Sequence, residues 1–181
     1  RKQSGSLIFW FNEFAEEVGP ENVQLIMHTD PHDQHGQNLA SIISDYGMGN
    51  DNRVILSTQK VPPEILSILY NLADCTINIS DAEGFGLATL ESLSCETPII
   101  VSMTGGLQEQ VTDGEQWFGI GIEPSSKAVI GSQSVPYINE DRVSKGDFIR
   151  ALKEIYNMSR EEREELGKKG RTHIENNYNF D

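Results

Sequence analysis

The sequence carries very little positive charge over its first two thirds. Between positions 3 and 126 the only cations are Arg53 and Lys60, against 18 acidic residues, and the 181-residue chain has a net charge of −14. Such a charge balance argues against a nucleic-acid polyanion as a partner. An anionic small molecule bound here must use backbone N–H groups, Lys60, the extreme N-terminus (Arg1, Lys2) or groups that the chain lacks.

Long apolar runs and cysteines are scarce as well. No apolar run reaches the roughly 18 residues that span a bilayer, so the sequence predicts no membrane-spanning segment. Cys75 and Cys95 lie far apart without metal-site spacing, which predicts free buried thiols in a reducing compartment and hence a cytoplasmic protein. The chain opens at Arg1-Lys2 without Met, which is compatible with a fragment, so a missing signal peptide proves little.

Short apolar strands alternate with amphipathic helices along most of the chain. Strands are expected at residues 23–27, 53–57, 75–79 and 99–102. Helices are expected at residues 7–18, 39–46, 62–72, 88–94, just after 106, 145–156 and about 160–178. This alternation predicts an α/β fold, a Rossmann-like parallel sheet with helices on both faces. From 117 to 143 the pattern loosens, and 129–132 with 135–138 predict only a small extension.

The most informative stretch reads Glu83-Gly84-Phe85-Gly86-Leu87-Ala88-Thr89-Leu90-Glu91. It places two carboxylates eight positions apart, with a glycine-rich turn directly after the first. The turn follows a predicted strand and opens a predicted helix, which is where open parallel sheets bind ligands. Free N–H groups at a helix start attract anions, and glycines let a phosphate approach closely. A carboxylate on each side can accept hydrogen bonds from sugar hydroxyls.

This stretch resembles the donor-site motif of retaining glycosyltransferases of the GT-B fold, glycosyltransferase family 4. That motif has a Glu, seven residues and a second Glu, with Gly-Phe-Gly after the first. A small-Gly-x-Pro turn precedes the next strand, and Glu96 stands here where the family usually has Gly. The run 69–74, the segment Gly105-Gly106-Leu107-Gln108-Glu109 and the closing charged helix follow in the family's order.

The resemblance implies one half of a GT-B fold. Residues 1–181 would form a single nucleotide-sugar (donor) binding domain, with the N-terminal acceptor domain absent from this chain. The substrate would be a nucleotide-diphosphate sugar, and the acceptor a glycan, a lipid or a small molecule. Because GT-B enzymes typically need no metal, no metal and no other cofactor is expected. The fragment alone should bind its donor weakly and turn over little.

The resemblance also implies roles for particular residues. Glu83 would face the transferred sugar as the catalytic-site carboxylate, and Glu91 the nucleotide ribose. Gly84 belongs to the same donor-binding turn, and the amides of Phe85, Gly86 and Leu87 would meet the diphosphate or the sugar. Lys2 looks like the lysine of the family's phosphate clamp, whose arginine would lie upstream of this chain.

Three further positions are assigned less directly. Lys60 stands just past the strand at 53–57, on the ligand edge of the sheet, where it either lies near the nucleotide base or is an ordinary surface lysine. Gly105 and Gly106 either make a simple strand-to-helix turn or touch the donor from the same edge.

A group of polar residues after the first strand raises the question of a metal. It consists of His28, Asp30, His32, Asp33 and His35. Their spacing matches no standard ligand set and Pro31 forbids a helical arrangement, so a polar loop is predicted. Two other classes of protein stay open: a GT-B sugar phosphorylase that uses inorganic phosphate, and a non-catalytic GT-B-like binding module.

Overall fold

The structure, a computed structural model, describes residues 2–34 and 36–178. These residues form two compact units. One contains Gln3–Val61, and the other contains Lys2 and the described residues from Pro62 onward. Arg1 and His35 lie outside the described residues. Among the helices that are described, none has the length and apolar character needed to cross a bilayer.

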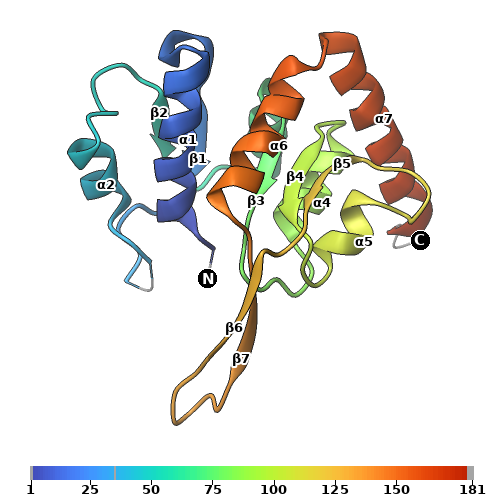
Figure 1. Cartoon of the computed structure of the whole chain (residues 1–181). Coiled ribbons are helices and arrows are strands. Elements are labelled where there is room, and N and C mark those ends of the chain that lie inside the picture. The colour runs from blue at the N-terminus through green and yellow to red at the C-terminus, as the bar shows by residue number, and fades with distance from the viewer. Residues whose placement is uncertain (1, 35, 179–181) are drawn as a thin grey trace. The chain divides into compact units, whose positions relative to one another are not determined.

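The Gln3–Val61 unit contains a long helix and a pair of parallel strands (Figure 1). Its elements are α1 (Ser4–Val18), η1 (Pro20–Asn22), β1 (Leu25–His28), α2 (Leu39–Asp45) and β2 (Val54–Ser57). The periodic apolar side chains of α1 are buried, as its amphipathic pattern predicts. Arg53, just before β2, donates a 2.7 Å hydrogen bond to Asn12 and pairs with Glu16, which ties the strand pair to α1.

The other unit is built on a three-stranded parallel sheet in the order β3-β4-β5. Its helices and sheet strands are α3 (Pro63–Leu72), β3 (Thr76–Asn78), α4 (Leu87–Ser94), β4 (Ile99–Ser102), α5 (Leu107–Val111), β5 (Gly119–Ile122), α6 (Lys145–Asn157) and α7 (Arg160–Asn177). All four residues of β4 are buried, so both faces of this central strand are covered.

Alternation along β4 divides the core between the two faces of the sheet. Ile99 and Val101 join one cluster with residues of α4, α5, α7 and the segment before β5, namely Leu93, Leu107, Val111, Phe118 and Ile174. Ile100 lies one residue out of phase and points to the opposite face, in front of which α6 runs in Figure 1. The α/β prediction, with parallel strands flanked by helices, is therefore confirmed.

The strand β5 is not predicted from the sequence. Its residues alternate Gly and Ile, so half of its positions lack the side chains that signal a strand. Gly119 is nevertheless required, because a Cβ at this position would lie 2.0 Å from the carbonyl oxygen of Ile99 on β4. The close approach of the β4 and β5 backbones therefore explains Gly119, and this glycine weakens the sequence signal for a strand.

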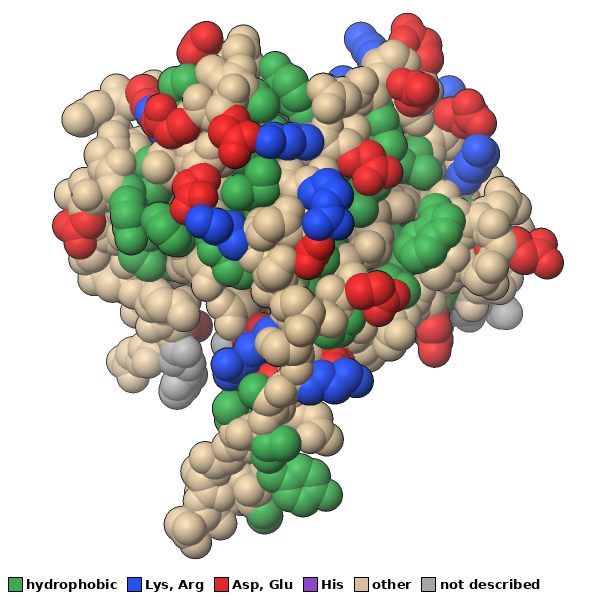
Figure 2. Space-filling view, in the orientation of Figure 1, with side chains coloured by type: hydrophobic (Ala, Val, Ile, Leu, Met, Phe, Trp, Pro, Cys, Tyr) green, Lys and Arg blue, Asp and Glu red, His purple; other side chains and the backbone are tan. Residues whose placement is uncertain are grey.

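The strands β6 (Ser126–Ile130) and β7 (Ile138–Arg142) form an antiparallel hairpin that projects from the unit (Figure 1). The expected small extension is in the right place, and its two strands extend beyond the segments 129–132 and 135–138 to residues 126 and 142. Residues 131–137 make the turn, where the Ser132 N–H donates a 2.7 Å hydrogen bond to the Val135 carbonyl. Apolar side chains gather along the outer half of the hairpin (Figure 2). Val129 and Tyr137 of this segment are exposed.

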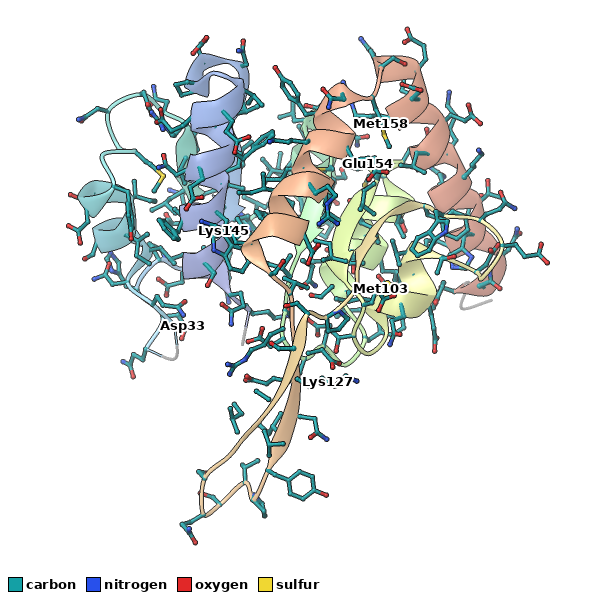
Figure 3. All side chains as sticks on the ribbon, viewed as in Figure 1. Asp33, Met103, Lys127, Lys145, Glu154 and Met158 are labelled. Carbon is teal, nitrogen blue, oxygen red and sulfur yellow. The ribbon has the colours of Figure 1, made fainter. Side chains whose placement is uncertain are left out.

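The base of the hairpin is fixed to the carboxyl edge of the sheet. The N–H of Asp141 donates a 2.7 Å hydrogen bond to the carbonyl of Asp81, which follows β3. The hydroxyl of Thr104, which follows β4, donates to the carboxylate of Asp141 at 2.9 Å. Lys127 also lies at this base, 3.5 Å from Asp141 (Figure 3). The hairpin therefore leaves the sheet at the edge where the predicted site lies.

Candidate functional site

Two loops at the carboxyl edge of the sheet meet at Glu83. One follows β3 and leads into α4, and the other follows β4 and leads into α5. A Cβ on Gly105 would lie 1.7 Å from the carbonyl oxygen of Glu83, and the N–H of Gly106 donates a 3.0 Å hydrogen bond to the carbonyl of Gly84. The predicted residues Gly105 and Gly106 thus lie directly against the predicted turn, at a distance that a side chain would prevent.

The carboxylate of Glu83 is held by partners from two segments, the N-terminus and the loop after β3. Lys2 forms an ion pair with it, and the Gly84 N–H donates a 3.2 Å hydrogen bond to Oε1. The Ser80 hydroxyl lies 3.4 Å from Oε2 and 2.6 Å from the side-chain oxygen of Asn78, at the end of β3. The structure therefore brings Lys2 and Glu83 together, although they stand 81 positions apart in the sequence.

The pKa of Glu83 is set by a competition between burial and these partners. Partial burial alone would raise the pKa of this carboxyl group, because the charged form loses solvation. The hydrogen bond and charge of Lys2, with hydrogen bonds from Asn78 and the Gly84 N–H, outweigh burial, and the pKa falls below its ordinary value. Glu83 is therefore an anion at neutral pH, suited to accept hydrogen bonds rather than to supply a proton.

The turn between Glu83 and α4 combines an open side with a tight side. A Cβ on Gly84 would meet no atom within 4 Å, so the space beside this residue is open to a ligand. Gly86 is the N-cap of α4 with φ +88°, and a Cβ there would lie 2.6 Å from Leu107. No side chain caps this helix start, so its amides are available to an anion. The side chains of Phe85 and Leu87 are exposed.

A buried glutamine on α5 holds the inner side of this turn. The side-chain amide of Gln110 donates hydrogen bonds to the carbonyls of Phe85 (2.7 Å) and Gly86 (3.2 Å), and its oxygen lies 2.6 Å from the Thr89 hydroxyl. Across a trans peptide the C=O of one residue and the N–H of the next point in opposite directions. Anchoring these two carbonyls on Gln110 therefore turns the N–H groups of Gly86 and Leu87 away from the core.

Glu91 lies on α4, one turn beyond the helix start, with its side chain exposed. The phenol of Tyr70 on α3 donates a 2.9 Å hydrogen bond to Oε2 of Glu91. Both motif carboxylates thus have a defined partner from outside the motif: a lysine for Glu83 and a tyrosine for Glu91.

Tyr70 and Gln110 are absent from the candidates that the sequence provides. Tyr70 belongs to an apolar helical run, where an aromatic residue is most simply explained by packing. Gln110 carried a weak signal, because it is a polar residue between the apolar Leu107 and Val111 of one short helix. A buried polar side chain requires partners, so its position beside the glycine turn could have been inferred only once the fold was known.

Lys60 and the polar loop belong to the Gln3–Val61 unit. Lys60 lies three residues after β2 and is exposed. At the ends of β1 and β2, the Nδ1 of His28 lies 3.0 Å from the hydroxyl of Ser57, and the His32 N–H donates to Asp30. Within residues 2–34 and 36–178, no group of three or more His, Cys, Asp or Glu side chains is arranged to hold a metal ion.

A separate groove of about 320 Å³ runs along α7. Lys168, Thr172 and His173 line it from α7, opposite Asp113 and Gln116 of the loop before β5. The ring of His173 stacks on Phe118 at 4.4 Å, and its Nε2 lies 2.8 Å from the carbonyl of Glu109. The lining of this groove includes neither Glu83 nor Glu91.

Known proteins resemble the chain in sequence and in structure. The D-inositol 3-phosphate glycosyltransferase of Acidothermus cellulolyticus is 35% identical over 79 residues, which are 44% of this chain and 17% of that protein. The C-terminal domain of a glycosyl transferase group 1 family protein (LpcC) from Francisella tularensis has a similar structure, with a TM-score of 0.69 and 18% identity. The match covers the whole of this chain and 83% of that domain's chain. Anabaena Alr3699/HepE, solved with UDP and glucose, is similar as well, with a TM-score of 0.60 and 14% identity. That match covers 92% of this chain and 47% of the HepE chain.

The curated relatives are much longer than the segment they share with this chain. The first ones are matched over less than a third of their own length. The two solved structures show a common fold. The sequence matches the profile of the family described as glycosyl transferases group 1 over residues 34–173, which is most of the chain. The protein therefore belongs to the glycosyl transferases group 1 family.

Proposed function

We propose that the chain is the donor-binding half of a retaining glycosyltransferase of family 4, which transfers a sugar from a nucleotide-diphosphate sugar. One observation carries the proposal above the others. The ionised Glu83 with Lys2, the uncapped start of α4 and the carboxylate of Glu91 lie along one turn and its helix at the carboxyl edge of the sheet. Family membership and the fold support the same reading.

In this proposal the donor lies across the turn. The amides of Gly86 and Leu87, with that of Phe85, bind the diphosphate, and Gly84 leaves space for its approach. Gly105 and Gly106 would touch the donor from the loop that packs against the turn. Glu91 accepts hydrogen bonds from the ribose hydroxyls, and Glu83 accepts them from the transferred sugar. Lys2 would exchange its contact with Glu83 for the β-phosphate, and Lys60 would lie near the nucleotide base.

The chemistry is substitution at the anomeric carbon with retention of configuration. The bond from that carbon to the β-phosphate oxygen breaks, the oxygen of the acceptor hydroxyl forms the new bond to the carbon, and the proton of that hydroxyl passes to the leaving phosphate. Negative charge builds on the leaving phosphate, where amides and a lysine held in place stabilise it without reorganisation. Fixed donors of this kind can perform the stabilisation that a metal ion supplies elsewhere, so we propose a metal-independent reaction.

The remainder of the enzyme belongs to the proposal as well. An N-terminal half would bind the acceptor, which is a glycan, a lipid or a small molecule, and residues 1–181 would act as one donor domain.

Cys75 and Cys95 are free thiols, and burial raises the pKa of Cys75 to about 12. Unpaired, unreactive cysteines favour a reducing compartment such as the cytoplasm.

Calorimetric titration of the chain with UDP, GDP and ADP, in low salt with EDTA, tests the proposal. We expect one nucleotide to bind despite the chelator, and Glu91→Gln to weaken it at least about tenfold, because a ribose acceptor is lost. Glu154→Gln removes an exposed carboxylate on α6 (Figure 3) and serves as the matched control. Failure of all three nucleotides to bind, or equal binding by the two variants, would contradict the proposed donor site.

A further inference from the structure

We propose that Tyr70 is a positioning residue for donor binding: its phenol holds the Glu91 carboxylate in the orientation that meets the nucleotide ribose. The inference rests on the function proposed above. Its basis is the 2.9 Å hydrogen bond from Tyr70 on α3 to Oε2 of Glu91 on α4. Hydrogen bonds that involve an ionised partner are the stronger kind, and they constrain direction as well as distance.

The backbone of Tyr70 is fixed to the segment that follows α4. The carbonyl of Tyr70 accepts a 2.8 Å hydrogen bond from the hydroxyl of Thr97 and a 3.1 Å bond from the Ala73 N–H. Thr97 is buried between α4 and β4. The end of α3 therefore cannot shift relative to the segment after α4 without breaking this partly buried hydrogen bond.

The same network reaches α4 and the sheet. The hydroxyl of Ser92, the residue after Glu91, lies 2.8 Å from the hydroxyl of Thr76 on β3 and 3.0 Å from the carbonyl of Thr97. Ser92 thus ties α4 to the start of β3 and to the segment before β4, and Thr97 ties that same segment to α3. The distance between the phenol and the carboxylate is consequently a property of the fold, set before any ligand arrives.

Glu91 needs such a partner because its side chain is exposed and long. A free glutamate on a helix surface samples several rotamers, and selecting one of them on binding costs conformational entropy. Burial and the neighbouring carboxylate raise the pKa of Tyr70, so the phenol remains a hydrogen-bond donor throughout the neutral range. The bond to Tyr70 therefore orders the carboxylate in the free protein.

The phenol does not serve the core, which makes its role testable. No residue of α3 is buried, so Tyr70→Phe removes one oxygen from a half-buried ring and leaves the packing in place. A purely structural role would lower the melting temperature and leave the affinity for nucleotide unchanged. A positioning role would lower the affinity for nucleotide and leave the melting temperature nearly unchanged.

The test is a double-mutant cycle on the 181-residue chain, with UDP, GDP and ADP as calorimetric probes. The variants are Tyr70→Phe, Glu91→Gln and the two combined, with Tyr46→Phe at the end of α2 as the matched loss of an exposed phenol. We expect Tyr70→Phe to weaken the bound nucleotide about tenfold, with Tm within about 2 °C of the parent. In the Glu91→Gln background, Tyr70→Phe should add no further loss.

Each other outcome has a distinct meaning. If Glu91→Gln weakens binding and Tyr70→Phe does not, the positioning role is wrong and the proposed function stands. If Tyr70→Phe causes the same loss in both backgrounds, Tyr70 acts independently of Glu91 and the inference is also wrong. If no nucleotide binds, or Glu91→Gln has no effect, the ribose role of Glu91 fails, and the inference fails with it.

Discussion

At the scale of single residues, Glu96 shows a backbone conformation held against the preference of its side chain. Its φ is +61°, the left-handed region that glycine adopts without cost. The N–H of Glu96 donates a 3.0 Å hydrogen bond to the Leu93 carbonyl and ends α4. A Cβ on Gly167 of α7 would lie 1.7 Å from the Glu96 carbonyl oxygen, so the backbone cannot relax. The turn after α4 thus places a non-glycine residue in the left-handed region.

Glu96→Gly is expected to stabilise the protein by about 1 kcal/mol, because a left-handed L-residue costs about 1–2 kcal/mol and glycine escapes part of that cost. Glu96→Ala is the matched control. It keeps the Cβ and removes only a carboxylate that lies 3.9 Å from Arg171, so its effect should stay within about 0.5 kcal/mol. Urea denaturation measures both, and equal shifts would show that backbone strain is not the cause.

The ion pair between Lys2 and Glu83 predicts a pH dependence of stability. The pKa of Glu83 in the folded state lies below its ordinary value of 4.5, so its contribution is present above that value and is lost as pH falls through the lowered pKa. Glu83→Gln should lower Tm at pH 7 by at most about 3 °C, since Lys2 is largely exposed. The difference should shrink in acid below pH 4.5.

Scanning calorimetry across pH checks this, with Lys2→Gln as the second background. In that background, Glu83→Gln should change Tm less, because the partner that lowers the pKa of Glu83 is gone. A Tm difference that stays constant from pH 7 to pH 3 would contradict the assigned role of Lys2.

At the scale of elements, sequence reasoning succeeded where one segment carries its own signal. The amphipathic helices and the strand–turn–helix around Glu83 were predicted. The structure shows a capping box at the start of α7, in which Ser159 and Glu162 cap each other reciprocally. The strand β5 was missed because two of its four residues are glycines: Gly119 lies against the backbone of β4, and Gly121 against the side chains of Met103 and Trp117.

The candidate site divides in the same way. Glu83, Glu91 and the glycines lie in one short segment, so their neighbourhood follows from local structure. The partners Lys2, Tyr70 and Gln110 come from separate segments, and only the packing of the unit brings them to the turn. Pairings of this kind depend on the tertiary fold, which local patterns do not encode.

The contact between the two loops predicts a strong effect of Gly105→Ala. The residue has φ +49°, and its new Cβ would collide with the Glu83 carbonyl, so the unfolding free energy should fall by at least about 2 kcal/mol. Gly114→Ala is the matched control, because Gly114 also has a positive φ of +94° but no atom within 4 Å of the added Cβ. Similar losses in the two variants would contradict the tight loop contact.

At the scale of the whole molecule, the acidic chain has few cationic side chains that could bind an anionic ligand. Lys2 pairs with Glu83, while Lys127 and Arg142, at the base of the hairpin, lie beside Asp141 and Glu140. In the proposed function, backbone amides would therefore supply most of the attraction for the diphosphate. Binding of the proposed donor should thus depend on the start of α4 more than on any side-chain charge.

Amide NMR spectra of the 15N-labelled chain during titration with UDP, GDP or ADP test this central claim most directly. We predict that the shifts are largest at Phe85, Gly86, Leu87, Gly105 and Gly106, the amides around the turn. Shifts confined to the groove along α7, at residues such as Lys168 and Thr172, would place the ligand elsewhere and contradict the account.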